Sequence, residues 1–160
     1  MIVYHGSINT IEKPIVSAGR DNLDFGKGFY ITDIWEQAET WASRLAERKD
    51  AVAIVNVYDI DLTKVQENYR YLKFPLYDEN WLRFIVSCRT GGNEWIKYDI
   101  IEGGVANDRV VDTVEAYMAG FMPLEYALAE LAKHQPNNQF CITNQNLIEE
   151  CLTFKESIQC

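Results

Sequence analysis

The sequence predicts a single domain of the α+β class, spanning residues 1–160. Strand-like and helix-like segments are interspersed without the regular β-α-β alternation that builds a doubly wound parallel sheet. A chain of 160 residues with 48% hydrophobic and 24% charged residues can form one hydrophobic core. No repeat, linker or low-complexity tract divides the chain, so we expect one compact domain.

The first part of the chain contains three predicted strands and one helix. Short β-branched and aromatic runs predict strands over Ile2–Tyr4 and Phe29–Thr32, and a Val- and Ile-rich run predicts one over Ala51–Asp59. Asp33 and Glu36 have capping-box spacing, which predicts that a helix begins at Asp33. Its apolar face recurs at helical spacing: Ile34, Ala38, Trp41, Ala42 and Leu45.

A second helix is predicted after Asp78, which is a suitable N-cap residue. Its buried face would consist of Trp81, Phe84, Ile85 and Cys88. The segment before it, Thr63–Tyr77, mixes aromatic residues with Lys and Arg, and its structure is left open.

The second half continues the mixture of strands and helices. Strands are predicted over Lys97–Glu102, Phe140–Ile142 and Leu152–Phe154. Helices are predicted after Asp108, from Pro123, and, as helix or turn, over Asn146–Cys151. In the polar set around Gly103-Gly104, Asp99 is interpreted as a paired structural carboxylate and Asp108 as an N-cap; the third member is Asn107.

The charge and cysteine content limit the classes of partner. A net charge of −9 repels phosphates and anionic lipids, so we expect neither a broad nucleic-acid surface nor a membrane surface. A small anionic ligand is still compatible with a local group of cations. The four cysteines lack zinc-site spacing, and Cys88 and Cys141 are predicted to be buried thiols. No signal peptide or membrane span is recognised, and the expected compartment is the cytosol.

Two short motifs carry the candidate chemistry. Tyr4-His5-Gly6-Ser7 places an imidazole at a strand end, beside a glycine that lets a ligand approach the backbone. Gly26-Lys27-Gly28 is followed by Tyr30, whose ring could stack on a flat ligand. Together these groups suit a nicotinamide and its ribose. The alternative is that His5 is a surface or capping group and Tyr30 a core residue.

These motifs, followed by Gln37-Ala38 and Trp41-Ala42, resemble the diphtheria-toxin and poly(ADP-ribose) polymerase branch of the ADP-ribosyltransferases. The chain is also similar to uncharacterised bacterial domains of that superfamily. The similarity covers residues 1–50 and returns at Asn138–Ile142. It implies an ADP-ribosyltransferase-like fold, with mixed or antiparallel split sheets around an NAD cleft and helices at the periphery.

The resemblance also implies roles for individual residues. His5 would hydrogen-bond ribose hydroxyls on the adenosine side of NAD, and the Gly6 backbone would bind the nicotinamide carboxamide. Tyr30 would stack on the nicotinamide ring. Ser7 and Gly28 complete the two motifs as NAD-contacting positions.

Gln139 occupies the third position of the catalytic triad, where the family has glutamate. A carboxylate there stabilises the oxocarbenium-like species formed when nicotinamide leaves, and it can orient an acceptor. A glutamine can hydrogen-bond the ribose 2′-hydroxyl but has no charge and no basicity. Loss of such a group lowers the rate by about a hundredfold to ten-thousandfold.

Arg20 and Lys27 lie between the two motifs and could bind the pyrophosphate of NAD. The alternative is that both are solvated surface cations. The resemblance implies an NAD-dependent mono-ADP-ribosyltransferase-like protein that releases nicotinamide, with a protein or small molecule as the unknown acceptor. An NAD glycohydrolase and an inactive module that binds NAD or a protein remain the alternatives.

Overall fold

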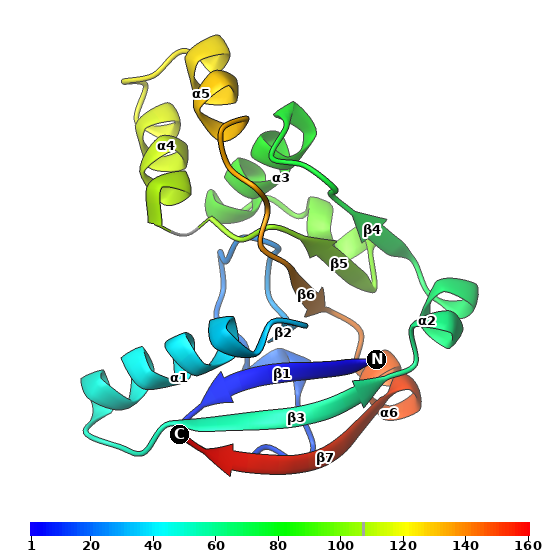
Figure 1. Cartoon of the computed structure of the whole chain (residues 1–160). Coiled ribbons are helices and arrows are strands. Elements are labelled where there is room, and N and C mark those ends of the chain that lie inside the picture. The colour runs from blue at the N-terminus through cyan, green and yellow to red at the C-terminus, as the bar shows by residue number, and fades with distance from the viewer. Residues whose placement is uncertain (107) are drawn as a thin grey trace.

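The computed structural model describes residues 1–106 and 108–160. Within these residues the strands form two sheets (Figure 1). One sheet is antiparallel, in the order β1-β3-β7. Its strands are β1 (Ile2–Ser7), β3 (Ile54–Ile60) and β7 (Leu152–Gln159).

The other sheet has the order β2-β6-β5-β4 and mixes parallel and antiparallel pairs. Only the β4–β5 pair of this sheet is parallel. Its strands are β2 (Phe29–Ile31), β6 (Gln139–Ile142), β5 (Ile100–Gly103) and β4 (Tyr71–Lys73). The predicted α+β class with mixed and antiparallel split sheets is therefore confirmed.

Helices flank the two sheets. α1 lies along β1, while α4 and α5 lie side by side at the end of the molecule away from the β1-β3-β7 sheet (Figure 1). The ambiguous segment before Asp78 contributes both α2 and β4. The helices are α1 (Trp35–Lys49), α2 (Leu62–Asn68), α3 (Glu79–Arg89), α4 (Asp108–Met118), α5 (Leu124–Leu131) and α6 (Gln145–Cys151).

Small residues let α1 pack closely on β1. Ala38, Ala42 and Ala46 form the buried face of the helix. A Cβ atom on Gly6 would lie 2.1 Å from the carbonyl oxygen of Ala38, so only glycine permits this approach. The packing fixes the position of β1, and therefore of His5, relative to the helix.

The two sheets meet at one bridge between Tyr4 and Thr32. The Tyr4 N–H donates to the Thr32 carbonyl at 2.7 Å, and the Thr32 N–H donates to the Tyr4 carbonyl at 2.9 Å. β1 and β2 share no longer ladder within the described chain. The strands therefore separate next to the bridge, at the position of His5 and Tyr30.

Several predicted boundaries were wrong. β1 does not end at Tyr4 but continues through His5-Gly6-Ser7. Gly6 is there because α1 packs too closely for a side chain, and it does not mark a turn. α1 begins at Trp35 and its N-cap is Ile34, so the predicted Asp33–Glu36 capping box does not form. The Ile34 N–H donates to the Thr32 hydroxyl at 3.1 Å. Trp41, expected in the core, is 43% exposed. Glu94–Lys97 is a short 3-10 helix, and β5 begins only at Ile100.

Other local predictions are confirmed. Asp78 caps α3 by accepting from the Trp81 N–H at 3.0 Å, and Trp81, Ile85 and Cys88 are buried on the inner face of the helix. Cys141 is also buried. The side chains of Asn107 and Asp108 fall outside the part of the chain whose side chains the structure describes.

Candidate functional site

His5 is held at the junction of the two sheets by the backbone of β2. Its Nδ1 lies 2.6 Å from the Tyr30 carbonyl oxygen, and because a carbonyl only accepts, Nδ1 carries the hydrogen. The ring packs on Phe29 with a centroid distance of 4.5 Å. Burial lowers the pKa of His5 below its ordinary value, and the hydrogen bond to Tyr30 opposes this only in part. The imidazole is therefore neutral at pH 7.

The second ring nitrogen of His5 is not used within the described chain. Nε2 has no hydrogen-bond partner among the residues that the structure describes. In the tautomer fixed by the Tyr30 carbonyl, Nε2 is an acceptor. It can therefore accept a hydrogen bond from a ligand hydroxyl.

The Tyr30 ring is fixed by its own loop. Its hydroxyl donates to the Gly26 carbonyl at 2.5 Å and accepts from the Phe25 N–H at 3.1 Å. The ring is half-buried and packs against the cluster of buried residues that includes Phe25 and Cys141. Burial, followed by the neighbouring Cys141, raises the pKa of Tyr30, so the phenol stays protonated.

Gln139 begins β6 and lies on the same face of the sheet as the Tyr30 side chain. Tyr30 pairs with Cys141, and side chains two residues apart on a strand share a face. Gln139 is half-buried, and its side chain has no hydrogen-bond partner among the described residues. The strand is fixed beside it, because the Thr32 hydroxyl donates to the Asn138 carbonyl at 2.6 Å.

The three triad candidates are thus brought together in part. His5 contacts the Tyr30 carbonyl, not the Tyr30 ring, and it packs on Phe29, which projects from the opposite face of β2. Tyr30 and Gln139 share the other face. A ligand that contacts all three side chains would therefore have to reach both faces of β2.

The motif glycines and Ser7 have packing roles that the sequence did not reveal. A Cβ atom on Gly28 would lie 2.4 Å from the Ile142 carbonyl oxygen, so this position, like Gly6, has no room for a side chain. Gly26 has φ +83 and lies against Trp95. The Ser7 hydroxyl accepts from the Asn9 N–H at 3.2 Å and shapes the turn after β1. The backbone at Gly6 and Gly28 thereby stays close to its neighbours.

The two cations of the connecting loop differ. Lys27 pairs with Asp21 at 3.7 Å, so part of its charge is already neutralised. Arg20 is exposed and forms no ion pair or hydrogen bond with the described part of the chain. Of the two, Arg20 is the better placed to bind an anion.

A buried polar cluster surrounds Glu102 on β5, and it was not predicted from the sequence. Glu102 is 7% exposed. It accepts hydrogen bonds from the Tyr71 hydroxyl and from Asn138 Nδ2, the latter at 3.1 Å, and Lys73 Nζ lies 3.7 Å away. Asn138 directly precedes Gln139, so this carboxylate fixes the start of β6. A carboxylate in an apolar strand is costly without partners, and that signal could have identified Glu102.

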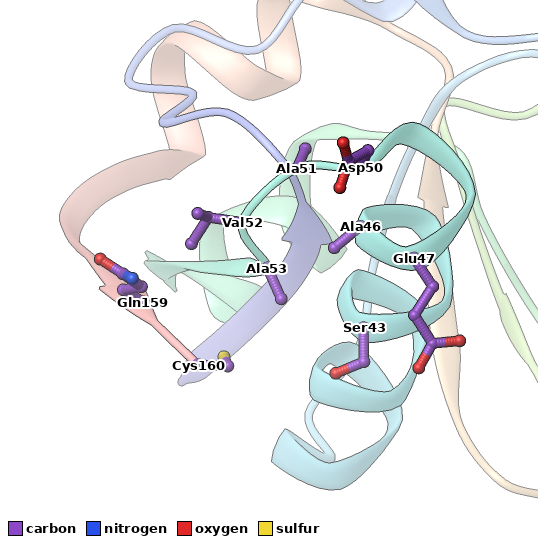
Figure 2. A pocket seen from close by; sticks show the side chains of 9 residues that line it. All are labelled: Ser43, Ala46, Glu47, Asp50, Ala51, Val52, Ala53, Gln159 and Cys160. Carbon is purple, nitrogen blue, oxygen red and sulfur yellow. The ribbon is translucent and has the colours of Figure 1, made fainter.

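Two hollows on the described surface lie away from these residues. One, of about 430 Å³, lies between the end of α1 and the end of β7 and includes Glu47, Asp50 and Cys160 in its lining (Figure 2). The other, of about 570 Å³, lies between α4 and the loop at Leu23. The described residues contain no cluster of three metal-ligating side chains. No described helix is both long enough and apolar enough to span a bilayer.

The structure is a small α+β fold with two split sheets and a histidine beside the bridge that joins them. The chain belongs to the family described as "Protein of unknown function (DUF3990)", whose model matches residues 1–154. Neither the curated proteins nor the solved structures give a significant match.

Proposed function

We propose that the chain is an NAD-dependent mono-ADP-ribosyltransferase-like protein. It would transfer ADP-ribose to a protein or small-molecule acceptor and release nicotinamide, and it would do so in the cytosol. The observation that carries the proposal is the neutral His5, bound through Nδ1 to the Tyr30 carbonyl where β1 and β2 separate. This geometry leaves an acceptor nitrogen at the junction of two sheets, as an NAD site of the ADP-ribosyltransferase type requires.

The residues around the junction supply complementary contacts for NAD. Nε2 of His5 would accept from a ribose hydroxyl. Gly6 lies in β1 two residues beyond the Tyr4–Thr32 bridge, so its backbone faces the side on which β2 has separated. There it would bind the carboxamide. The half-buried ring of Tyr30, fixed through its hydroxyl, would stack on nicotinamide with its remaining exposed surface, and Arg20 would bind the pyrophosphate.

Gln139 would act on the ribose of the departing nicotinamide. In the reaction the C1′–N bond breaks, its electron pair leaves with nicotinamide, and the acceptor or water attacks C1′ and loses a proton to solvent. The Gln139 amide would hold the 2′-hydroxyl, but it adds no negative charge and accepts no proton. We therefore propose slow mono-transfer rather than chain elongation.

The same residue supports a second candidate, a module that binds NAD or a protein without turnover. The site would then keep His5 and Tyr30 for affinity while Gln139 leaves the ribose cation unstabilised. NAD glycohydrolysis is the intermediate case, because it needs only water as the acceptor. The three differ in what happens to nicotinamide and to the ADP-ribose.

The decisive experiment incubates the protein with NAD and follows free nicotinamide, with mass spectrometry of the protein and of added acceptors as the second readout. For a weak transferase or hydrolase, Gln139→Glu should raise nicotinamide release about tenfold or more, since it restores the charge at a site of unchanged shape. Gln135→Glu, an equal charge change at an exposed position of the preceding loop, is the matched control and should not alter the rate.

The outcomes separate the candidates. Nicotinamide with a mass increase on an acceptor supports the transferase, and nicotinamide with free ADP-ribose supports the hydrolase. NAD binding without release, in both native protein and Gln139→Glu, supports the binding module. Absence of NAD binding by calorimetry in the folded protein would reject the transferase, the hydrolase and the NAD-binding module, and would leave only a module that binds a protein.

A further inference from the structure

The helical hairpin of α4 and α5 ends in an exposed apolar surface. Phe121 is 88% exposed and Tyr126 69%, the two highest values among the large hydrophobic side chains described. Met118, at the end of α4, is 38% exposed. Isolated exposed hydrophobic residues are ordinary, but these three lie within nine positions of one helical hairpin, and exposed apolar side chains that gather in this way typically mark an interaction site. We call Met118, Phe121 and Tyr126 the hairpin tip.

The backbone holds Phe121 in this exposed position. Gly120 has φ +81, its N–H donates to the Tyr117 carbonyl at 3.1 Å, and the Phe121 N–H donates to the Ala116 carbonyl at 3.0 Å. These two bonds form a Schellman motif. In such motifs the residue at the Phe121 position often packs back on the helix, but here its side chain is almost fully exposed. The turn is rigid and its apolar side chain is uncovered.

A hollow continues from the tip toward the loop at residues 22–24. Leu23, Met118 and Ala119 supply apolar walls, and the Asp24–Arg89 ion pair, with an O–N distance of 2.7 Å, lies in the lining. The exposed carboxylate of Glu115 also lines it. The space of about 570 Å³ can take a long side chain with an apolar stem and a positive head.

The charge around the tip selects the partner. From residue 108 to residue 133 the chain has five carboxylates, at Asp108, Asp112, Glu115, Glu125 and Glu130, and two cations, Arg109 and Lys133, of which Lys133 pairs with Glu130 at 2.6 Å. A second copy would bring an equally acidic hairpin to a two-fold interface, where like charges repel. A partner with positive charges beside an apolar side chain would match both the patch and its surroundings.

We propose that the hairpin tip and its adjoining hollow are a docking surface for a basic protein segment that carries an exposed aliphatic or aromatic side chain. Phe121 and Met118 provide the apolar contact, and Glu115 binds a Lys or Arg of the partner. The tip lies on α4 and α5, away from β1 (Figure 1), and none of the proposed NAD-contacting residues lines the hollow, so the inference does not depend on the proposed NAD chemistry.

Methionine-methyl NMR provides a direct test, because the chain has three methionines, Met1, Met118 and Met122. The probe is a synthetic peptide with two leucines flanked by lysines and arginines, and its comparison peptide has serines in place of the leucines. We expect the leucine peptide to shift the Met118 methyl signal, leave Met1 unchanged and bind less tightly as salt increases. Phe121→Ser should weaken the binding about tenfold, whereas Leu76→Ser, at a position 60% exposed elsewhere, should not.

Three results would overturn the proposal. The first is a Met118 shift that is equal for the leucine and serine peptides, which would mean that charge alone attracts them. The second is no shift of the Met118 methyl signal when the leucine peptide is added to the native protein. The third is a concentration-dependent dimer in sedimentation that Phe121→Ser abolishes, because the occupant would then be a second copy.

Discussion

Two polar groups of this molecule, Asp99 and His5, differ in how completely the protein satisfies them. Asp99 directly precedes β5 and is 7% exposed. Its carboxylate accepts from the Arg70 backbone N–H at 2.8 Å, from the Arg70 guanidinium at 2.9 and 3.2 Å, and from Asn144 Nδ2 at 3.1 Å. His5 uses one ring nitrogen on Tyr30 and leaves the other without a described partner.

This difference separates a structural group from a candidate binding group. Burial alone would raise the pKa of Asp99, but the hydrogen bonds from Arg70 and Asn144 outweigh it and lower the pKa below its usual range. The acceptor capacity of the carboxylate is used within the protein. At His5 burial dominates the pKa, and Nε2 remains an acceptor without a described partner. A ligand hydroxyl can donate a hydrogen bond to it.

The largest expected effect is the loss of stability on removing Asp99, whose carboxylate has its hydrogen bonds within the protein. Asp99→Ala removes four hydrogen bonds and leaves the Arg70 N–H and Asn144 amide unpartnered, so we expect a loss of about 2–4 kcal/mol in the free energy of unfolding. Urea denaturation measures it. Asp112→Ala, at an exposed position on α4, is the control and should change little. The NAD affinity of the folded Asp99→Ala protein should equal that of the native chain. A loss of affinity in the folded variant would place Asp99 in the binding site and contradict the division between a structural Asp99 and a ligand-binding His5.

Within Tyr30 the same division between ligand binding and structure can be tested, because the ring is proposed to bind NAD and the hydroxyl to stabilise the fold. Tyr30→Ala removes the proposed stacking face and should weaken NAD binding by about 1–3 kcal/mol. Tyr30→Phe keeps the ring but loses the bonds to Gly26 and Phe25, and should cost about 1 kcal/mol of stability with NAD affinity retained. Calorimetry with NAD and urea denaturation measure the two effects. If Tyr30→Phe loses as much NAD affinity as Tyr30→Ala, the hydroxyl, not the ring, contacts the ligand.

Local sequence signals predicted those parts of the fold that depend on neighbours in the chain. Asp78 caps α3 three residues away, and the Val- and Ile-rich run from Ala51 becomes the central strand β3. The start of α1 could not be predicted in the same way. Asp33 has the better capping sequence, but no side chain caps α1, whose N-cap residue is Ile34. The Thr32 hydroxyl instead accepts from the Ile34 N–H and donates to the carbonyl of Asn138, which is 106 positions further along the chain. Tertiary contacts decide such boundaries.

The candidate site was predictable only through its motifs. His5 and Tyr30 stand out because glycines accompany them, although Gly6 and Gly28 also have packing roles that only the structure reveals. The contact of Glu102 with Asn138 depends on the pairing of β5 with β6, and the sequence does not encode that register locally.

The ribose contact proposed for His5 should be weaker than the stacking on Tyr30. His5→Ala removes one hydrogen bond to NAD and should weaken binding by about 1 kcal/mol. His5→Asn keeps an N–H that can donate to the Tyr30 carbonyl but removes Nε2, and should lose affinity to the same degree. Calorimetric titration with NAD measures both variants. Full affinity in His5→Asn would contradict a role for Nε2.

The smallest expected effect is the pH dependence of stability that His5 creates. Because burial lowers the pKa of folded His5 below its ordinary value of 6.5, the unfolded chain binds the proton more readily. Stability should therefore be fully retained above about pH 6.5 and should fall as the pH decreases from there toward the lower pKa of the folded state.

Urea denaturation of native protein and His5→Asn between about pH 7.5 and 5.5, a range above most carboxylate titrations, isolates this contribution. In His5→Asn the free energy of unfolding should change less with pH than in the native protein. His134→Asn, which changes the one other histidine, is the control and should keep a steeper pH dependence than His5→Asn. An unchanged slope in His5→Asn would mean that His5 gains its proton as easily in the folded protein as in the unfolded chain. The acceptor at Nε2, and with it the contrast to Asp99, would then be lost under mildly acidic conditions.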